Sequence, residues 1–262
     1  MTGPLERELR AKRDAGRKLL VPYITGGFDG WEDAIRAAAA NGADAIEIGI
    51  PFSDPVMDGP VIQQASQAAL DRGATPLSVL AAVPALDVDV PLVVMTYYNL
   101  VYRSGHERFA ASLAKAPVAG AIVPDLPLEE VGPWADAADA AGVETVLLAA
   151  PTGSDERLAR ICERSRGFVY GVGLLGVTGE RDALAASALQ IAGRLKAITD
   201  KPVLIGVGVS TAAQAAEVAE VADGAVVGSA LVRRLLDGGG PAAAGELVAE
   251  LRAGLDGAGV GS

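Results

Sequence analysis

Two carboxylates in one short stretch are the residues of this sequence best suited to chemistry. Residues 43–60, ADAIEIGIPFSDPVMDGP, begin as a predicted strand and end as an acidic, proline-rich loop. Ile46, Ile48 and Ile50 alternate with small residues, so one face of the strand should pack under helices. Glu47 lies on the other face. A carboxylate buried among small neighbours costs free energy, so we interpret this stretch as an active site.

The second carboxylate, Asp58, follows in the loop. One buried and one loop carboxylate can hold different pKa values and divide acid and base work between them. Each also has a simpler interpretation. Glu47 could form a structural ion pair or lie in solvent. The sequence Asp58-Gly59-Pro60 forms turns without any catalytic role.

Glycine-rich segments are the third feature. Gly176-Val-Thr-Gly179, Gly206-Val-Gly208 and Gly228-Ser229 each follow a predicted strand. Backbone amides at a helix start bind phosphate, and glycine lets the anion approach closely. Taken singly, each glycine is more simply a turn residue.

These residues need a framework, and a repeated pattern supplies it. Segments such as NGADAIEIGI, APVAGAIVPD, AGVETVLLAA and VADGAVVGSA each join a helix end to a Val/Ile/Ala-rich strand. Such alternation predicts a parallel sheet of βαβ units. Besides the stretch above, we expect strands at residues 19–24, 92–95, 118–123, 143–149, 167–171, 202–205 and 223–227.

Eight such units in about 250 residues match an α/β fold of the (β/α)8 TIM-barrel type. We expect one domain, residues 1–262, with an extra N-terminal helix around Leu5 and Leu9 and a short phosphate-binding helix after strand eight. Loops after strands seven and eight often bind phosphate in such barrels. An open doubly wound sheet is the alternative fold.

Composition excludes several classes. The formal net charge of −11, with no basic stripe, argues against nucleic-acid or anionic-membrane binding. The single cysteine, Cys162, forms no internal disulfide, and one histidine, His106, leaves no zinc cluster. The charged N-terminus is unlike a signal peptide, and no apolar run reaches about 18 residues. We therefore expect a cytoplasmic protein without a bound metal.

The motifs, in order along the chain, resemble the tryptophan synthase alpha subunit family. They are Pro51-Phe-Ser-Asp-Pro55 with Asp58-Gly-Pro60, Tyr97, Asn99-Leu-Val, Asp125-Leu-Pro127, Gly176-Val-Thr-Gly179, Gly206-Val-Gly208-Val-Ser210 and Gly228-Ser-Ala230. The resemblance implies a TIM barrel that cleaves indole-3-glycerol phosphate to indole and glyceraldehyde 3-phosphate. It also implies a pyridoxal-phosphate beta subunit as partner, in an alpha2beta2 assembly, and no cofactor in this chain.

The resemblance also implies residue roles. Glu47 would protonate indole C3, and Asp58 would hold the indole N–H. Pro51 and Asp54 would face the partner. The substrate would be bound by residues along the later strands and loops: Tyr170, Thr178, Gly179, Gly208, Gly228 and Ser229.

The sequence departs from the family pattern in three loops. Gly27-Phe28-Asp29 replaces a Gly-Asp-Pro run, Gly173-Leu174-Leu175 replaces a Ser-Arg-Ser run, and Met57 stands where a smaller residue is common. Three other functions stay open: a stand-alone lyase that releases free indole, another phosphate-binding barrel such as a sugar-phosphate isomerase, and an inactive regulatory subunit. The presence of both Glu47 and Asp58 argues against the last.

Overall fold

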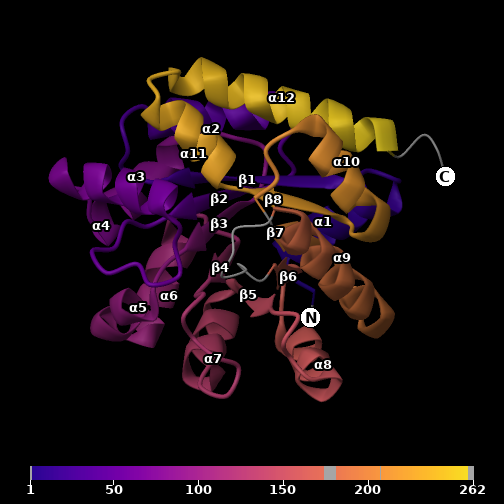
Figure 1. Ribbon diagram of the computed structural model, residues 1–262. Helices are drawn as coiled ribbons and strands as arrows, with labels where there is room; N and C mark the ends of the chain where they lie inside the picture. The colour runs from indigo at the N-terminus through magenta and orange to yellow at the C-terminus, as the bar shows by residue number, and fades with distance from the viewer. Residues whose placement is uncertain (1, 174–180, 207, 259–262) are drawn as a thin grey trace.

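A computed structural model shows a closed barrel of eight parallel strands ringed by helices (Figure 1). The structure describes residues 2–173, 181–206 and 208–258. Each strand pairs with its sequence neighbours, and β1 closes the barrel against β8. The strands are β1 (Leu19–Thr25), β2 (Ile46–Gly49), β3 (Leu92–Met95), β4 (Gly120–Ile122), β5 (Glu144–Ala149), β6 (Val169–Val172), β7 (Val203–Gly206) and β8 (Gly224–Val227). This is the TIM barrel that the sequence predicts.

Helix α1 precedes the first strand, and the other helices follow the strands and cover the outside of the barrel. They are α1 (Pro4–Asp14), α2 (Trp31–Ala40), α3 (Pro60–Asp71), α4 (Pro76–Ala82), the 3-10 turn η1 (Val83–Ala85), α5 (Tyr98–Ser104), α6 (His106–Lys115), α7 (Gly132–Ala141), α8 (Asp155–Arg164), α9 (Arg181–Ile198), α10 (Ala212–Val221), α11 (Ser229–Leu236) and α12 (Gly240–Ala258). The predicted extra N-terminal helix is α1, and the predicted short helix after strand eight is α11.

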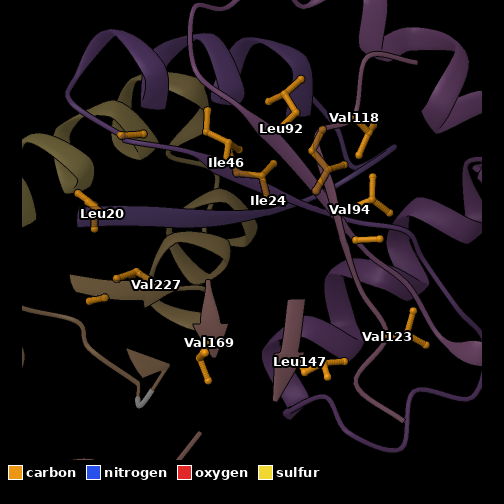
Figure 2. Packing of buried hydrophobic residues seen from close by; sticks show 14 of the residues in the cluster. Leu20, Ile24, Ile46, Leu92, Val94, Val118, Val123, Leu147, Val169 and Val227 are labelled. Atoms are coloured by element: carbon orange, nitrogen blue, oxygen red, sulfur yellow. The ribbon is translucent and has the colours of Figure 1, made fainter. Parts of the chain in front are cut away.

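Strand residues divide between two apolar layers because alternate side chains point to opposite faces. The outward residues, among them Leu20, Ile24, Ile46 and Val94, pack under the helices (Figure 2). The inward residues, among them Leu19, Val21, Ala45, Val93 and Phe168, fill the barrel interior. The interior is therefore a packed core, and chemistry is confined to the ends of the strands.

Helix α1 closes the amino-terminal end of the barrel. Leu5 and Leu9 are fully buried and join the interior cluster. The carboxylate of Glu144, at the start of β5, accepts hydrogen bonds from the backbone N–H groups of Leu5 (2.6 Å) and Glu6 (3.1 Å). These bonds satisfy two amides that the first helical turn leaves unpaired. The open end of the barrel is therefore the carboxyl-terminal one.

Helix α5 is the element that the sequence did not predict. Its sequence, YNLVYRS, is short and rich in aromatic residues, which gives it little intrinsic helix preference. The carboxylate of Asp125, from the loop after β4, accepts a hydrogen bond from the backbone N–H of Tyr98 at 2.8 Å. The helix start is therefore capped by a residue distant in sequence, which no local pattern reveals. Among the described residues, no helix is long and apolar enough to cross a membrane.

Candidate active site

Glu47 lies on β2 with its side chain on the inward face of the strand, opposite Ile46 and Ile48. The residue is only 1% exposed. Within the described part of the chain, its Oε2 atom has no hydrogen-bond partner. Burial, and then the charge of Asp58, raises the pKa of Glu47 to about 8. The side chain is therefore largely protonated at neutral pH and can serve as an acid.

Asp58 lies in the loop between β2 and α3, just before the helix start at Gly59. Burial raises its pKa to about 6, while a hydrogen bond with the Tyr97 side chain lowers it. Asp58 is consequently ionised at neutral pH. The structure thus places a protonated Glu47 close enough to an ionised Asp58 for the Asp58 charge to raise the pKa of Glu47. Two carboxyl groups with different protonation states are what the sequence led us to expect.

Two tyrosines lie on the inward face beside this pair. Tyr23, on β1, is opposite Glu47 in the strand register. Tyr170, on β6, has a pKa raised well above its usual value by burial and then by the charge of Glu47. Each ring lies against a glycine of the next strand: a Cβ added at Gly49 would be 1.9 Å from the Tyr23 hydroxyl, and one at Gly206 would be 2.5 Å from the Tyr170 ring. The glycines make room for the rings around the pair.

Tyr170 is a predicted site residue that the structure brings to the carboxylates. Sequence reasoning assigned no role to Tyr23 or Tyr97, although the pKa of each is raised by burial and by the charge of Asp58. The alternation Leu19, Val21, Tyr23 puts a polar group on the inward face at the end of β1. That signal was available in the sequence, whereas the approach of Tyr97 to Asp58 depends on the loop fold.

Three of the predicted phosphate-binding residues, Gly208, Gly228 and Ser229, lie after β7 and β8, which are paired neighbours. Gly228 is the N-cap of α11, and no side chain among the residues that the structure describes caps this helix start. Ser229 is the first residue of the helix and is exposed. Gly208 has φ +68°, a backbone conformation that favours glycine. Uncapped amides beside two glycines are suited to hold an anion.

The remaining predicted residues have different fates. Thr178 and Gly179 lie outside the described residues. Pro51 is buried, whereas Asp54 is exposed and its carboxylate accepts a hydrogen bond from the Ser53 hydroxyl. Met57, which stands where the family has a smaller residue, is 54% exposed, and its neighbour Val56 is 80% exposed. The outer part of this loop therefore presents both charge and apolar surface.

Comparison with known proteins identifies the family to which the sequence is similar. The family model of the tryptophan synthase alpha chain matches residues 9–252. The tryptophan synthase alpha chain of Thermobifida fusca is 48% identical over 240 residues, covering 89% of each chain. That of Streptomyces coelicolor is 46% identical over 256 residues, covering 96% of this chain and 94% of that one.

Solved structures of tryptophan synthase have the same fold as this chain. A chain of Mycobacterium tuberculosis tryptophan synthase, in an open form with BRD0059 bound, superimposes with a TM-score of 0.88 at 39% identity, covering 97% of this chain and 99% of that one. The tryptophan synthase alpha subunit of Legionella pneumophila gives a TM-score of 0.87 at 32% identity, covering 98% and 100%.

Proposed function

The chain belongs to the tryptophan synthase alpha chain family, and from this premise we propose that Glu47 and Asp58 are its catalytic pair. The reaction is the cleavage of indole-3-glycerol phosphate to indole and glyceraldehyde 3-phosphate in tryptophan biosynthesis. The observation that supports these roles best is the contrast between the two carboxyls. Glu47 is protonated and fully enclosed, while its neighbour Asp58 is ionised at the same pH.

The proposed mechanism moves one proton onto the substrate and one off it. Glu47 donates its proton to C3 of the indole ring, and positive charge develops on the ring nitrogen. The Asp58 carboxylate accepts a hydrogen bond from the indole N–H and stabilises that charge. Glu47 becomes a carboxylate when it loses its proton. Either this carboxylate or that of Asp58 then takes the hydroxyl proton of the glyceryl chain. The C–C bond then breaks, releasing indole and the aldehyde.

Phosphate binding is assigned to the part of the barrel mouth after β8, which is separated from β2 by β1 alone. The amides at Gly228 and Ser229, with Gly208 beside them, would hold the phosphate. Tyr170 would line the site beside Glu47, and the family motif adds Thr178 and Gly179. Phosphate binding there would hold the reacting carbon against the carboxylates, and such positioning supplies a large part of catalysis.

A beta subunit is the proposed partner, with pyridoxal phosphate held by that subunit and not by this chain. Asp54 and the exposed Val56 and Met57 would contribute to the contact, together with Tyr102, which is 68% exposed on α5. Pro51, being buried, would act by stiffening the loop. Released indole is apolar, so a partner docked over this end of the barrel could capture it directly.

Indole release by the purified chain tests the catalytic assignment. Glu47→Gln and Asp58→Asn keep the size of each side chain but remove the proton donor and the charge. General acid–base catalysis contributes about 10²–10⁴ in rate, so each variant should lose at least a hundredfold in kcat. Glu246→Gln, at an exposed carboxylate on α12, is the matched control and should behave as wild type. Retention of more than about a tenth of the rate by either catalytic variant would remove that residue from the mechanism.

A further inference from the structure

Tyr97 occupies the junction between the active-site loop and the next unit of the barrel. It directly precedes α5 as its N-cap and is only 2% exposed. Its ring stacks on Phe52, with ring centres 5.1 Å apart and planes inclined by 27°. Its hydroxyl accepts a hydrogen bond from the backbone N–H of Met57 at 3.0 Å. Tyr97 therefore contacts the loop between β2 and α3 at both its beginning and its end.

The same hydroxyl also lies near the side chain of the next residue, Asp58, and their interaction lowers the pKa of that carboxyl. A tyrosine hydroxyl can accept one hydrogen bond and donate another at the same time. Burial and the charge of Asp58 raise the pKa of Tyr97 far above its usual value. The hydroxyl therefore keeps its proton over the working range of the enzyme and remains a donor to the carboxylate.

We infer that Tyr97 is a positioning residue for Asp58: its hydroxyl bonds the adjacent Met57 amide and so keeps the Asp58 carboxylate beside that hydroxyl. This inference rests on the proposed role of Asp58 and extends it to a residue that does not itself transfer a proton. Two further bonds hold the backbone of this turn: the Asp58 N–H donates to the Pro55 carbonyl at 3.3 Å, and Nε2 of Gln63 on α3 donates to the Asp58 carbonyl at 2.8 Å. The tyrosine hydroxyl adds a link from this turn to the residue that precedes α5.

The link has a consequence for how the site responds to its surroundings. Val56 and Met57 have exposed side chains, but the Met57 amide is bonded to the oxygen that holds Asp58. A displacement of the exposed turn therefore changes the position of the catalytic carboxylate through Tyr97. A protein docked against Val56 and Met57 would hold that turn, and with it the hydroxyl, in one arrangement.

Tyr97→Phe tests the inference because it keeps the ring and its stacking on Phe52 while removing only the hydroxyl. Without the donor, the pKa of Asp58 should rise, since the lost hydrogen bond favoured the charged form. The acidic limb of kcat/KM for indole release should therefore move upward by about one pH unit. A purely structural role would lower the rate at every pH and leave the limb in place. Amide hydrogen exchange at Met57 should also become at least about tenfold faster, because its acceptor is gone.

Tyr98→Phe is the matched control. The Tyr98 hydroxyl is 3.1 Å from Nε2 of His106, so its removal leaves Asp58 untouched, and the limb should stay at the wild-type pH. An unchanged limb or unchanged Met57 exchange in Tyr97→Phe would overturn the inference. Asp58→Asn distinguishes this failure from failure of the proposed function. Full activity in Asp58→Asn would contradict the proposed role of Asp58. An inactive Asp58→Asn, together with an unshifted acidic limb in Tyr97→Phe, would contradict only the role of Tyr97.

Discussion

At the scale of single residues, the pKa values of Glu47 and Asp58 make a prediction about pH. The mechanism needs Asp58 ionised and Glu47 protonated. Asp58 is ionised above about pH 6, and Glu47 is protonated below about pH 8. We therefore expect a bell-shaped profile of kcat/KM with limbs near these values, the two limbs belonging to the interacting pair. Indole release between pH 5 and pH 9.5 measures it, and a rate that continues to rise above pH 9 would rule out Glu47 as the acid.

The buried position of Glu47 also has a cost in stability, which predicts a second result. Folding raises its pKa from 4.5 to about 8, so the folded chain keeps a proton that the unfolded chain releases. The free energy of unfolding is therefore not reduced by this group below pH 4.5, and it decreases as the pH rises from there toward about 8. Glu47→Gln has no such loss.

Thermal unfolding at several pH values measures this effect. The melting temperature of Glu47→Gln should exceed that of wild type by a margin that grows from pH 5 to pH 8, reaching roughly 5 °C, and then stays constant. Glu246→Gln, at an exposed site, should show no such trend. A margin that is the same at every pH would mean that Glu47 is not buried as a neutral acid.

At the scale of elements, the start of α11 is predicted to bind the substrate phosphate. Among the described residues, the atom nearest to a Cβ added at Gly228 would be the Cβ of Tyr23, at 3.5 Å. The fold therefore tolerates a side chain there, although a phosphate lying on the helix start would not. Gly228→Asp should raise KM at least tenfold, because it places a carboxylate where the phosphate would bind. Glycerol phosphate should raise the melting temperature of wild type but not of Gly228→Asp; equal protection would place the anion elsewhere.

The elements also show which parts of the molecule were predictable. Strands and most helices follow from hydrophobic period and turn residues, which are local properties. Glu47 could be found because a carboxylate interrupts the inward face of an otherwise apolar strand. Helix α5 could not be predicted from the sequence, because the residue that caps its start, Asp125, belongs to another βα unit. The approach of Tyr97 to Asp58 was hidden for the same reason: it joins two loops whose proximity exists only after the barrel closes.

At the scale of the whole molecule, closure of the barrel gathers the proposed functional groups within the described residues at one end. Helix α1 covers the other end with Leu5 and Leu9. The carboxylates come from β2 and its loop, and the anion-binding amides come from α11 after β8. Strands β1, β2 and β8 are direct neighbours. Groups far apart in the sequence therefore surround one opening, and the exposed turn at Val56 and Met57 forms part of its rim.

The last prediction concerns this rim and the proposed beta subunit. Asp54 is exposed, and the proposed chemistry does not need it. The proline-stiffened loop that bears it loses little entropy on docking, which favours its use as an interface. A partner that orders this loop should raise the rate of indole release, and Asp54→Ala should reduce that activation about tenfold while changing the basal rate less than twofold. Steady-state assays with and without a purified beta subunit measure both rates, with Glu246→Ala as the control. Equal loss of basal and activated rates, or full activity without any partner, would instead favour a stand-alone lyase.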